Sequence, residues 1–332
     1  MRPTLGQETG GEGRHPSAWC RRSSVAQRLR VAVHTDHAAT MTAVALGKFD
    51  ALHLGHRALA ETVAALAPAP ALLTFSGMAE VLGWPAREPL VATSDRPRIV
   101  TDWARLSRTT LGWIEQPFAA VRSLSPSDFI DFLRHDLAVT AVVVGEDFRF
   151  GRGRSGNADD LRRLAVAAGL AVAVVPHVAH QGVSVSSSRI RHLLESGEVT
   201  AAAAQLGRWH RVVGTVKRGD GRGRTLGFPT ANCSARENLV PGVGVYACWA
   251  EINGARYPAA LNIGYLPTIS ADRTLSVEAH LLGFSGDCYG QRLALDLVAR
   301  VRDEQRFSSL EALKAQLARD VAQIPGILAA AG

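Results

Sequence analysis

Residues 41–176 contain short, continuous apolar runs that alternate with segments whose apolar residues recur at helical spacing. The continuous runs predict buried strands and the periodic segments predict helices. Buried strands that alternate with helices predict a parallel sheet covered on both faces. The strands are expected at 44–46, 71–75, 141–144 and 171–176, the helices at 57–66, 126–137 and 158–168, and a helix followed by a strand within 103–113.

The pattern changes after residue 208, where apolar and polar residues alternate and glycines mark the turns. This pattern predicts short antiparallel strands that form a small barrel. A short helix at 199–206 connects the two patterns. We therefore divide the chain into a first domain at 41–198, a linker at 199–208 and a second domain at 209–326. In the second domain, strands are expected at 211–216, 243–252, 256–261, 276–282 and 293–301, and a helix at 309–321.

Residues 1–40 differ from the rest of the chain. Residues 4–14 are rich in glycine and polar side chains, and 19–30 carry several arginines without a clear apolar face. This composition is typical of a disordered extension. Its arginine-rich, acid-poor character slightly resembles a transit peptide. We favour the simpler interpretation that translation starts at Met41, immediately before the first predicted strand.

Composition limits the classes of function. Hydrophobic residues make up 47% of the 332 residues, enough for real cores. No apolar run reaches the roughly 18 residues of a membrane span, so no membrane association is expected. The four cysteines lack the CxxC spacing of zinc sites, and without a secretory signal a reducing compartment, the cytoplasm, is expected. The net charge of +7 raises the question of nucleic acid. Because no basic block with interleaved aromatics is present, we expect phosphate-containing substrates instead.

The first group of candidate residues lies where the strand at 44–46 turns into the helix at 57–66. His53 and His56 are three residues apart, so on the first turn of a helix they point the same way. Free N–H groups at a helix N-terminus bind anions, and two imidazoles beside them suggest stabilisation of charge on a nucleotide's phosphates. Ligands of parallel sheets bind beyond the carboxyl ends of the strands. We therefore expect 47–56 and 145–151 to line one cleft.

A run of serines precedes the apolar-periodic segment 189–196. Serine hydroxyls can cap a helix there, and Gly197 is suited to end it. Arg191 lies on the same side as the helix start. Ser187, Ser188 and Arg191 are therefore a candidate phosphate clamp.

These segments resemble the two signatures of nucleotidyltransferases, which join a nucleotide to a phosphorylated acceptor and release pyrophosphate. Residues 47–56 resemble the HxGH signature, and 185–191 resemble the ISSTxIR motif with Ser188 in the threonine position. The resemblance implies catalytic roles for His53 and His56. It implies nucleotide-binding roles for Gly47, Phe49, Asp50, Gly55, Asp147, Ser187, Ser188 and Arg191.

A second chemical centre is the sequence KRGDGRGRTLGFPTAN at 217–232. A glycine-rich backbone that carries arginines can curl around phosphates, using N–H groups and charge together. Residues 225–232 resemble the PTAN motif of riboflavin kinases. The resemblance implies that Thr230 and Asn232 bind Mg²⁺ with ATP, and Mg²⁺ prefers such oxygen ligands. The loop is expected to contact the nucleotide through Gly219, Gly221, Arg222 and Gly223.

Further segments extend the resemblance to riboflavin kinases. Glu278 takes the position of the family's catalytic base, which a primary alcohol needs near neutral pH. Asn262, Arg302 and Phe307 are implied to lie near the flavin. The segments at 241–246, 262–268, 277–280, 287–290 and 302–307 look like the family's PGVYA, NIGxRPT, VEVH, DLYG and RDExxF strings.

From Met41 to about Val321 the chain resembles the bifunctional riboflavin kinase/FAD synthetases of bacteria. The resemblance implies a Rossmann-like α/β nucleotidyltransferase domain of the HxGH type and a small six-stranded Greek-key β-barrel with a terminal helix. It implies that the barrel phosphorylates riboflavin to FMN and that the α/β domain adenylylates FMN to FAD. ATP is the implied co-substrate and Mg²⁺ the implied cofactor, with no membrane or nucleic-acid partner.

Four departures from the family pattern leave alternatives open. Ala51 replaces a glycine, Ser-Gly-Met at 76–78 replaces a PHP-like segment, Leu266 replaces an arginine and Gly283 replaces an aspartate. One alternative is a monofunctional riboflavin kinase whose first domain is an inactive scaffold. Another is a flavin- or RNA-binding regulator, against which the retained Glu278 argues. The sequence also leaves self-association open.

Overall fold

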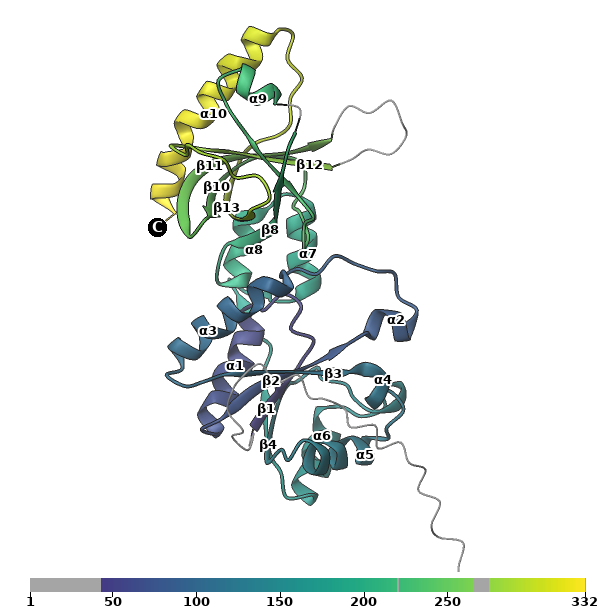
Figure 1. Cartoon of the computed structure of the whole chain (residues 1–332). Helices are drawn as coiled ribbons and strands as arrows, with labels where there is room; N and C mark the ends of the chain where they lie inside the picture. Colours follow the sequence, from purple (N-terminus) through teal and green to yellow (C-terminus); the bar gives the residue numbers. More distant parts are fainter. Residues whose placement is uncertain (1–42, 220, 266–274, 332) are drawn as a thin grey trace, which may run out of the picture. The chain divides into compact units, whose positions relative to one another are not determined.

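Figure 1 shows the computed structural model, which describes residues 43–219, 221–265 and 275–331. These residues all belong to one structural unit, 32–332. The expectations for residues 1–40, for a start at Met41 and for Leu266 lie outside the described residues. Within the described part, no helix is long and apolar enough to cross a membrane.

The first half of the described chain forms a five-stranded parallel sheet with the strand order β3-β2-β1-β4-β5. Four of the five strands predicted in this half are confirmed to within two residues, because each carries the continuous apolar run of a buried parallel strand. The fifth, β3, lies at 112–117 and so largely beyond the segment 103–113 in which it was expected. The strands are β1 (Ala43–Leu46), β2 (Pro70–Ser76), β3 (Gly112–Pro117), β4 (Ala141–Gly145) and β5 (Ala171–Val175).

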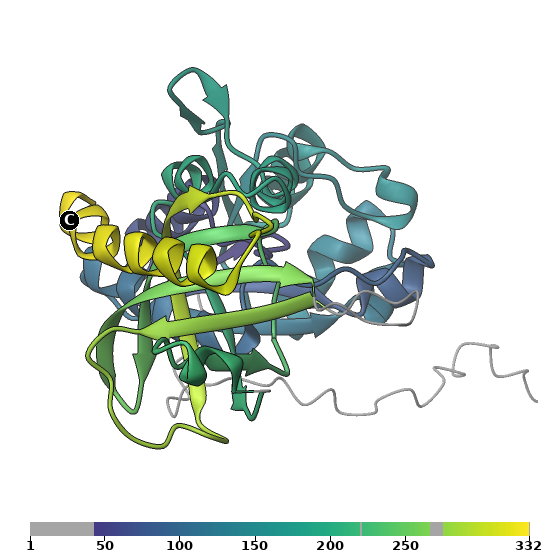
Figure 2. The same ribbon diagram turned by 90° about the horizontal axis from the view of Figure 1, so that it is seen from above.

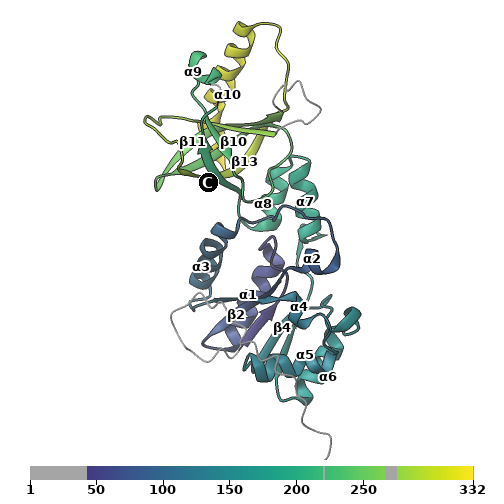
Figure 3. The ribbon, with the colours of Figure 1, turned by 45° about the vertical axis from the view of Figure 1, so that its right-hand side comes forward.

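Helices cover both faces of this sheet, with α1 and α3 on one side and α5 and α6 on the other (Figures 1 and 3). Ala43 and Ala45 of β1 pack in the apolar cluster on the side of α1 and α3. Val44 and Leu46 pack in the apolar cluster on the side of α5 and α6. Successive strand residues point to opposite faces, so a wholly apolar β1 contributes to both cores. These helices are α1 (Leu54–Leu66), α3 (Arg96–Leu106), α5 (Pro126–Asp131) and α6 (Ala158–Ala167).

Several predicted helix bounds in this half are wrong. Helix α1 begins at Leu54 because His53 caps it. Helix α3 begins at Arg96 rather than near 103, with a proline in its first turn. The helix expected at 126–137 is capped by Ser125 but changes at Phe132 into a π-helical turn, η2 (Phe132–Asp136). The short elements that were not predicted are α2 (Met78–Leu82), η1 (Thr93–Asp95), α4 (Phe118–Val121), η3 (Arg152–Arg154), β6 (Ala179–His180) and β7 (Val183–Ser184).

Two consecutive helices, α7 (Ser187–Glu195) and α8 (Val199–Leu206), lead into the second half. Helix α8 has the bounds predicted for the connecting helix. Its buried residues join an apolar cluster that includes Ile190 and Leu194 of α7 and also Val212 and Leu295 of the barrel. Helix α8 is therefore part of a continuous core and not a solvated linker.

The second half of the described chain forms a closed antiparallel barrel with the strand order β10-β11-β12-β9-β8-β13. The predicted fold class, an α/β domain followed by a six-stranded barrel with a terminal helix, is confirmed. The strands are β8 (His210–Lys217), β9 (Ala231–Ser234), β10 (Gly244–Ile252), β11 (Ala255–Tyr265), β12 (Leu275–Leu281) and β13 (Arg292–Arg302); a short helix, α9 (Arg222–Thr225), precedes β9.

The terminal helix α10 (Leu310–Ala330) packs against the barrel strands (Figure 2). It extends nine residues beyond the predicted end at 321 and continues through Pro325. Ile324 and Leu328 are buried against Ala247 and Val298 of the barrel, and this burial offsets the hydrogen bond that a proline removes from a helix.

Candidate active sites

The turn after β1 carries the first candidate site. Gly47 donates its N–H to the Leu73 carbonyl, and the Thr74 hydroxyl donates to the Lys48 carbonyl at 3.0 Å, so β2 fixes the turn. Phe49 is fully buried, and its ring lies 5.1 Å from the His56 ring in an edge-on contact. A Cβ on Gly47 would lie 3.0 Å from the Phe49 ring, so glycine permits this packing.

His53 and His56 lie together at the start of α1, as predicted. Their rings stack with centroids 3.7 Å apart and an interplanar angle of 12°. The His53 Nδ1 accepts the His56 N–H at 3.3 Å and caps the helix. A neutral His53 ring therefore carries its proton on Nε2 and can donate it to a ligand. Gly55 leaves room for this arrangement, because a Cβ there would lie 3.1 Å from the His53 ring.

Burial keeps both imidazoles neutral near pH 7. It lowers the pKa of His53 to about 4, with Arg208 adding to the effect and Asp147 opposing it. Burial also lowers the pKa of His56 well below its ordinary value, and His53 and Arg208 act in the same direction. The His56 Nδ1 is buried without a hydrogen-bond partner among the described residues. An unpaired buried polar atom costs about 1–3 kcal/mol.

A third buried histidine, His210 on β8, gives a prediction for stability. Its Nε2 lies 2.8 Å from the Leu239 carbonyl, and burial lowers its pKa to about 4. In the unfolded chain His210 has an ordinary pKa near 6.5, so on acidification the unfolded chain binds the proton first. The contribution of the neutral His210 to the free energy of unfolding is therefore fully present above about pH 6.5. It falls by up to about 3 kcal/mol as the pH falls toward 4. We expect the thermal midpoint to fall between pH 6.5 and 5, and to fall less in His210→Gln. The exposed His177→Gln is the control; an equal fall in both variants would contradict the prediction.

Arg191 and Asp50 connect the two nucleotidyltransferase-like motifs. The Arg191 Nη2 donates to the Asp50 Oδ2 at 3.3 Å and to the Glu88 carbonyl at 2.8 Å. The Asp50 Oδ1 accepts the Leu90 N–H at 3.0 Å. Asp50 therefore fixes Arg191 beside the turn after β1.

The remaining candidates of the first site come from neighbouring elements. Strands β1 and β4 are adjacent, which places Asp147, two residues after β4, near His53. Ser187 and Ser188 occupy the first turn of α7, and Ser186 caps that helix through the Arg189 N–H. The structure thus brings residues from three parts of the chain to one edge of the sheet: the turn after β1, the turn after β4, and α7.

The second candidate site is a row of polar side chains on neighbouring barrel strands. Asn262 of β11 pairs in register with Glu278 of β12, which pairs with Asn232 of β9. The flanking residues Val277 and Ala279 are buried in the barrel core. Because strand residues alternate between faces, the polar row projects away from that core.

Glu278 has polar neighbours on both carboxylate oxygens. The Ser276 hydroxyl donates to Oε1 at 2.8 Å, and the Thr230 hydroxyl donates to Oε2 at 3.5 Å. His280 lies 2.7 Å from the Pro229 carbonyl and packs edge-on against Phe228, which holds the segment before β9. Thr230, Asn232 and Glu278 are thus brought together as predicted.

The glycines of the 217–232 segment permit close approach to this row. A Cβ on Gly219 would collide with the Asn232 amide, and a Cβ on Gly223 would collide with the Phe228 carbonyl. Gly221 has a φ of +71°, a left-handed conformation that favours glycine, and Arg222 begins α9.

The donor set of this site fits Mg²⁺ bound together with a nucleotide. The described residues contain no cluster of three or more His, Cys, Asp or Glu side chains suited to a metal ion. Thr230 and Asn232 instead offer one hydroxyl and one amide oxygen beside the Glu278 carboxylate. Mg²⁺ commonly takes few protein ligands, with phosphate and water oxygens completing its shell.

Of the expected flavin-binding residues, Arg302 is held by α10 and Phe307 contacts Arg302. The Arg302 guanidinium donates to the Asp320 carboxylate at 2.8–3.2 Å and lies over the Phe307 ring. Asn262 is separate from them, opposite Glu278.

Two family models match successive parts of the chain: FAD synthetase at residues 35–189 and riboflavin kinase at residues 206–328. A bifunctional riboflavin kinase/FMN adenylyltransferase of Pseudomonas fluorescens is 35% identical over 282 residues, covering 83% of this chain and 90% of that protein. The chain belongs to the bifunctional riboflavin kinase/FMN adenylyltransferase family.

A second relative and a solved structure are also similar to this chain. The bifunctional riboflavin kinase/FMN adenylyltransferase of Escherichia coli K12 is 34% identical, with 83% of this chain and 89% of that protein covered. A crystal structure described as a macrolide-efflux protein from Streptococcus pneumoniae is 26% identical, with a TM-score of 0.77 over 87% of this chain and 95% of that chain. The family predicted from the motifs is therefore confirmed, whereas the roles of individual residues stay predictions.

The departures from the family pattern have local explanations where the structure describes them. Ala51 is buried and has no positive φ; the left-handed residues of this turn are Phe49 and Leu52, so alanine at 51 needs no strained backbone. Gly77 has a φ of +68° and directly precedes α2, which begins at Met78, so the Ser-Gly-Met segment leads from β2 into a short helix. Gly283 also has a positive φ, of +76°, which suits glycine better than aspartate.

The structure adds polar groups that the motifs did not indicate. The Lys48 ammonium lies 4.8 Å from the Trp84 ring centroid, and Trp84 is half exposed. Arg208 reaches the turn after β1 from the far end of α8. Lys48 lies inside the segment 47–56 that resembles the HxGH signature, so the sequence could have indicated it as a candidate site residue. Nothing in the sequence around Arg208 indicates its contact.

Proposed function

We propose that this family member makes FMN from riboflavin and FAD from FMN, using ATP in both reactions. The proposal assigns adenylylation to residues 41–198, phosphorylation to residues 209–326 and a connecting role to 199–208. It is supported chiefly by the assembly of both motif sets: the His53–His56 stack at the sheet edge, and the Asn232–Glu278–Asn262 row on the barrel.

In the proposed kinase reaction, Glu278 takes the proton of the riboflavin 5′-hydroxyl as the hydroxyl oxygen attacks the γ-phosphorus of ATP, and ADP leaves. Thr230 and Asn232 would hold Mg²⁺ together with the nucleotide phosphates. When bound, Mg²⁺ offsets the phosphate charge. The backbone N–H groups of Gly219, Gly221 and Gly223 are the proposed further donors to the phosphates.

In the proposed adenylyltransferase reaction, an FMN phosphate oxygen attacks the α-phosphorus of ATP, and pyrophosphate leaves. No protein nucleophile is needed. The neutral His53 donates its Nε2–H, and His56 and Arg191 add donors where negative charge develops. The Ser187 and Ser188 hydroxyls and the N-terminus of α7 face the same anion.

A product time course tests this function. Purified protein with riboflavin, ATP and Mg²⁺ is expected to form FMN first and FAD later, as separated by chromatography, and EDTA is expected to stop both steps. FMN that accumulates without FAD would favour the inactive first domain. Absence of both products would overturn the proposal.

A further inference from the structure

We infer that Arg208, at the junction of α8 and β8, positions the turn that carries His53 and His56. The inference rests on the proposed adenylyltransferase function and adds a positioning residue to it. Arg208 lies outside both nucleotidyltransferase-like motifs. It follows Leu52, the residue of the turn that it contacts, by 156 residues in the sequence.

The turn needs external support because its backbone is strained. Phe49 and Leu52 have φ angles of +49° and +48°, a left-handed conformation that is unfavourable for side chains of this size. Ala51 and Leu52 are fully buried, so their carbonyl groups need partners within the protein.

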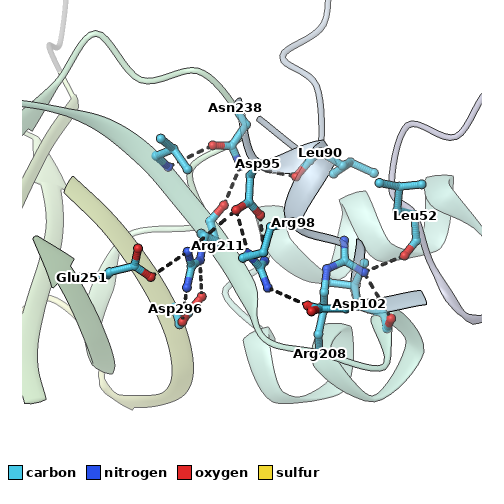
Figure 4. A network of polar contacts seen from close by, with 12 residues as sticks. Leu52, Leu90, Asp95, Arg98, Asp102, Arg208, Arg211, Asn238, Glu251 and Asp296 are labelled. Carbon is cyan, nitrogen blue, oxygen red and sulfur yellow. Dashed lines mark hydrogen bonds and ion pairs between the residues drawn. The ribbon is translucent and has the colours of Figure 1, made fainter. Parts of the chain in front are cut away.

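Arg208 supplies those partners. Its Nη1 donates to the Leu52 carbonyl at 2.6 Å and its Nη2 donates to the Ala51 carbonyl at 2.7 Å (Figure 4). One planar guanidinium thus holds the peptide groups on both sides of the left-handed Leu52, a geometry that lysine cannot reproduce. The next residue is His53, which caps α1. The contacts of Arg208 therefore fix the backbone position from which the His53 and His56 side chains project.

The backbone beside Arg208 packs against the same place. Helix α8 ends at Gly207, whose φ is +71°, and a Cβ there would lie 2.6 Å from the Leu54 side chain. Leu54 is the first residue of α1. The junction therefore contacts the turn through both a side chain and the main chain.

Neighbouring arginines have different partners. Figure 4 shows Arg98 paired with Asp95, and Arg211 paired with Asp296, at distances of 2.7–2.8 Å. Arg208 is directed away from these carboxylates toward the turn. Its positive charge also lowers the pKa of both His53 and His56, in agreement with its proximity to the rings.

The test compares Arg208→Met with Arg256→Met. Arg208 and Arg256 both line a cavity of about 340 Å³ and carry the same charge. Arg256, however, lies over the Trp209 and Trp249 rings. We expect Arg208→Met to lower kcat for FAD synthesis from FMN by about 100-fold, because small misplacements of catalytic groups cost that much. The KM values for FMN and ATP, and FMN formation from riboflavin, are expected to stay unchanged. Arg208→Lys is expected to recover part of kcat.

Equal kcat in Arg208→Met and Arg256→Met would overturn the inference, as would an equal loss of both activities in Arg208→Met. If Arg208→Met does not fold, as judged by thermal unfolding, Arg208→Lys carries the comparison. If the unmodified chain makes no FAD, the proposed function fails separately. The imidazole NMR signals of His53 and His56 then decide: a shift in Arg208→Lys, which keeps the positive charge, but not in Arg256→Lys supports positioning, and no shift in Arg208→Lys refutes it.

Discussion

Replacing His56 with alanine is expected to slow FAD synthesis from FMN and ATP by about 10²- to 10³-fold, the usual effect of removing one donor that stabilises transition-state charge. The His56 ring is neutral, stacked on His53, and presents a buried Nδ1 that lacks a protein partner within the described chain. FMN formation from riboflavin is expected to persist, because the barrel residues that support it are untouched. Both rates are measured by chromatography on one preparation.

His53 allows a sharper control because it also caps α1. Asparagine is a good N-cap residue and alanine is not, so His53→Ala is expected to cost about 1 kcal/mol of stability that His53→Asn keeps. Both variants lose the Nε2–H donor, and both are expected to lose FAD synthesis to a similar degree. A His53→Asn variant that makes FAD at the unmodified rate would refute the assigned role.

Replacing Glu278 with glutamine is expected to slow riboflavin phosphorylation by about 10²- to 10⁴-fold, the range for loss of a general base. Glutamine keeps the size of the side chain and can still accept the Ser276 hydroxyl, which now lies 2.8 Å from the carboxylate. It cannot take the proton of the riboflavin hydroxyl. When FMN is supplied instead of riboflavin, FAD synthesis is expected to be unchanged.

Ser276→Ala is the matched control for this site. It removes a hydrogen bond to Glu278 but leaves the base in place, so its effect on FMN formation is expected to be smaller than that of Glu278→Gln. Unchanged FMN formation in Glu278→Gln would show that another group accepts the proton, and the assignment of Glu278 would have to be withdrawn.

Four of the five strands of the α/β half were predictable because they are continuous apolar runs, whereas β3, with Glu115 and Gln116, is not such a run and was misplaced. The bounds of α3 were not, because its first turn contains two arginines and a proline and lacks an apolar face. The end of α10 was missed for another reason: the burial of Ile324 and Leu328 against the barrel continues the helix through Pro325, and only the folded barrel supplies that surface. Strand β9 has only four residues, two of them polar, and its pairing partners define it.

The motif residues of both sites were found from the sequence because each motif is local. The contacts that hold the motifs were not local. Arg191 and Asp50 are 141 residues apart, and Arg208 and Leu52 are 156 apart. No periodicity or composition relates such pairs, so the support of the first site could be seen only in three dimensions.

The apolar cluster that runs from α7 through α8 into the barrel limits where the coding regions of the two halves can be separated or joined. Val199, Ala202 and Leu206 of α8 are almost completely buried, and they share that cluster with Val212 and Leu295. A recombination event within 199–208 would leave apolar surface without its partner in each product. A gene that joins two coding regions at this point therefore needs matching apolar surfaces on both sides of the junction.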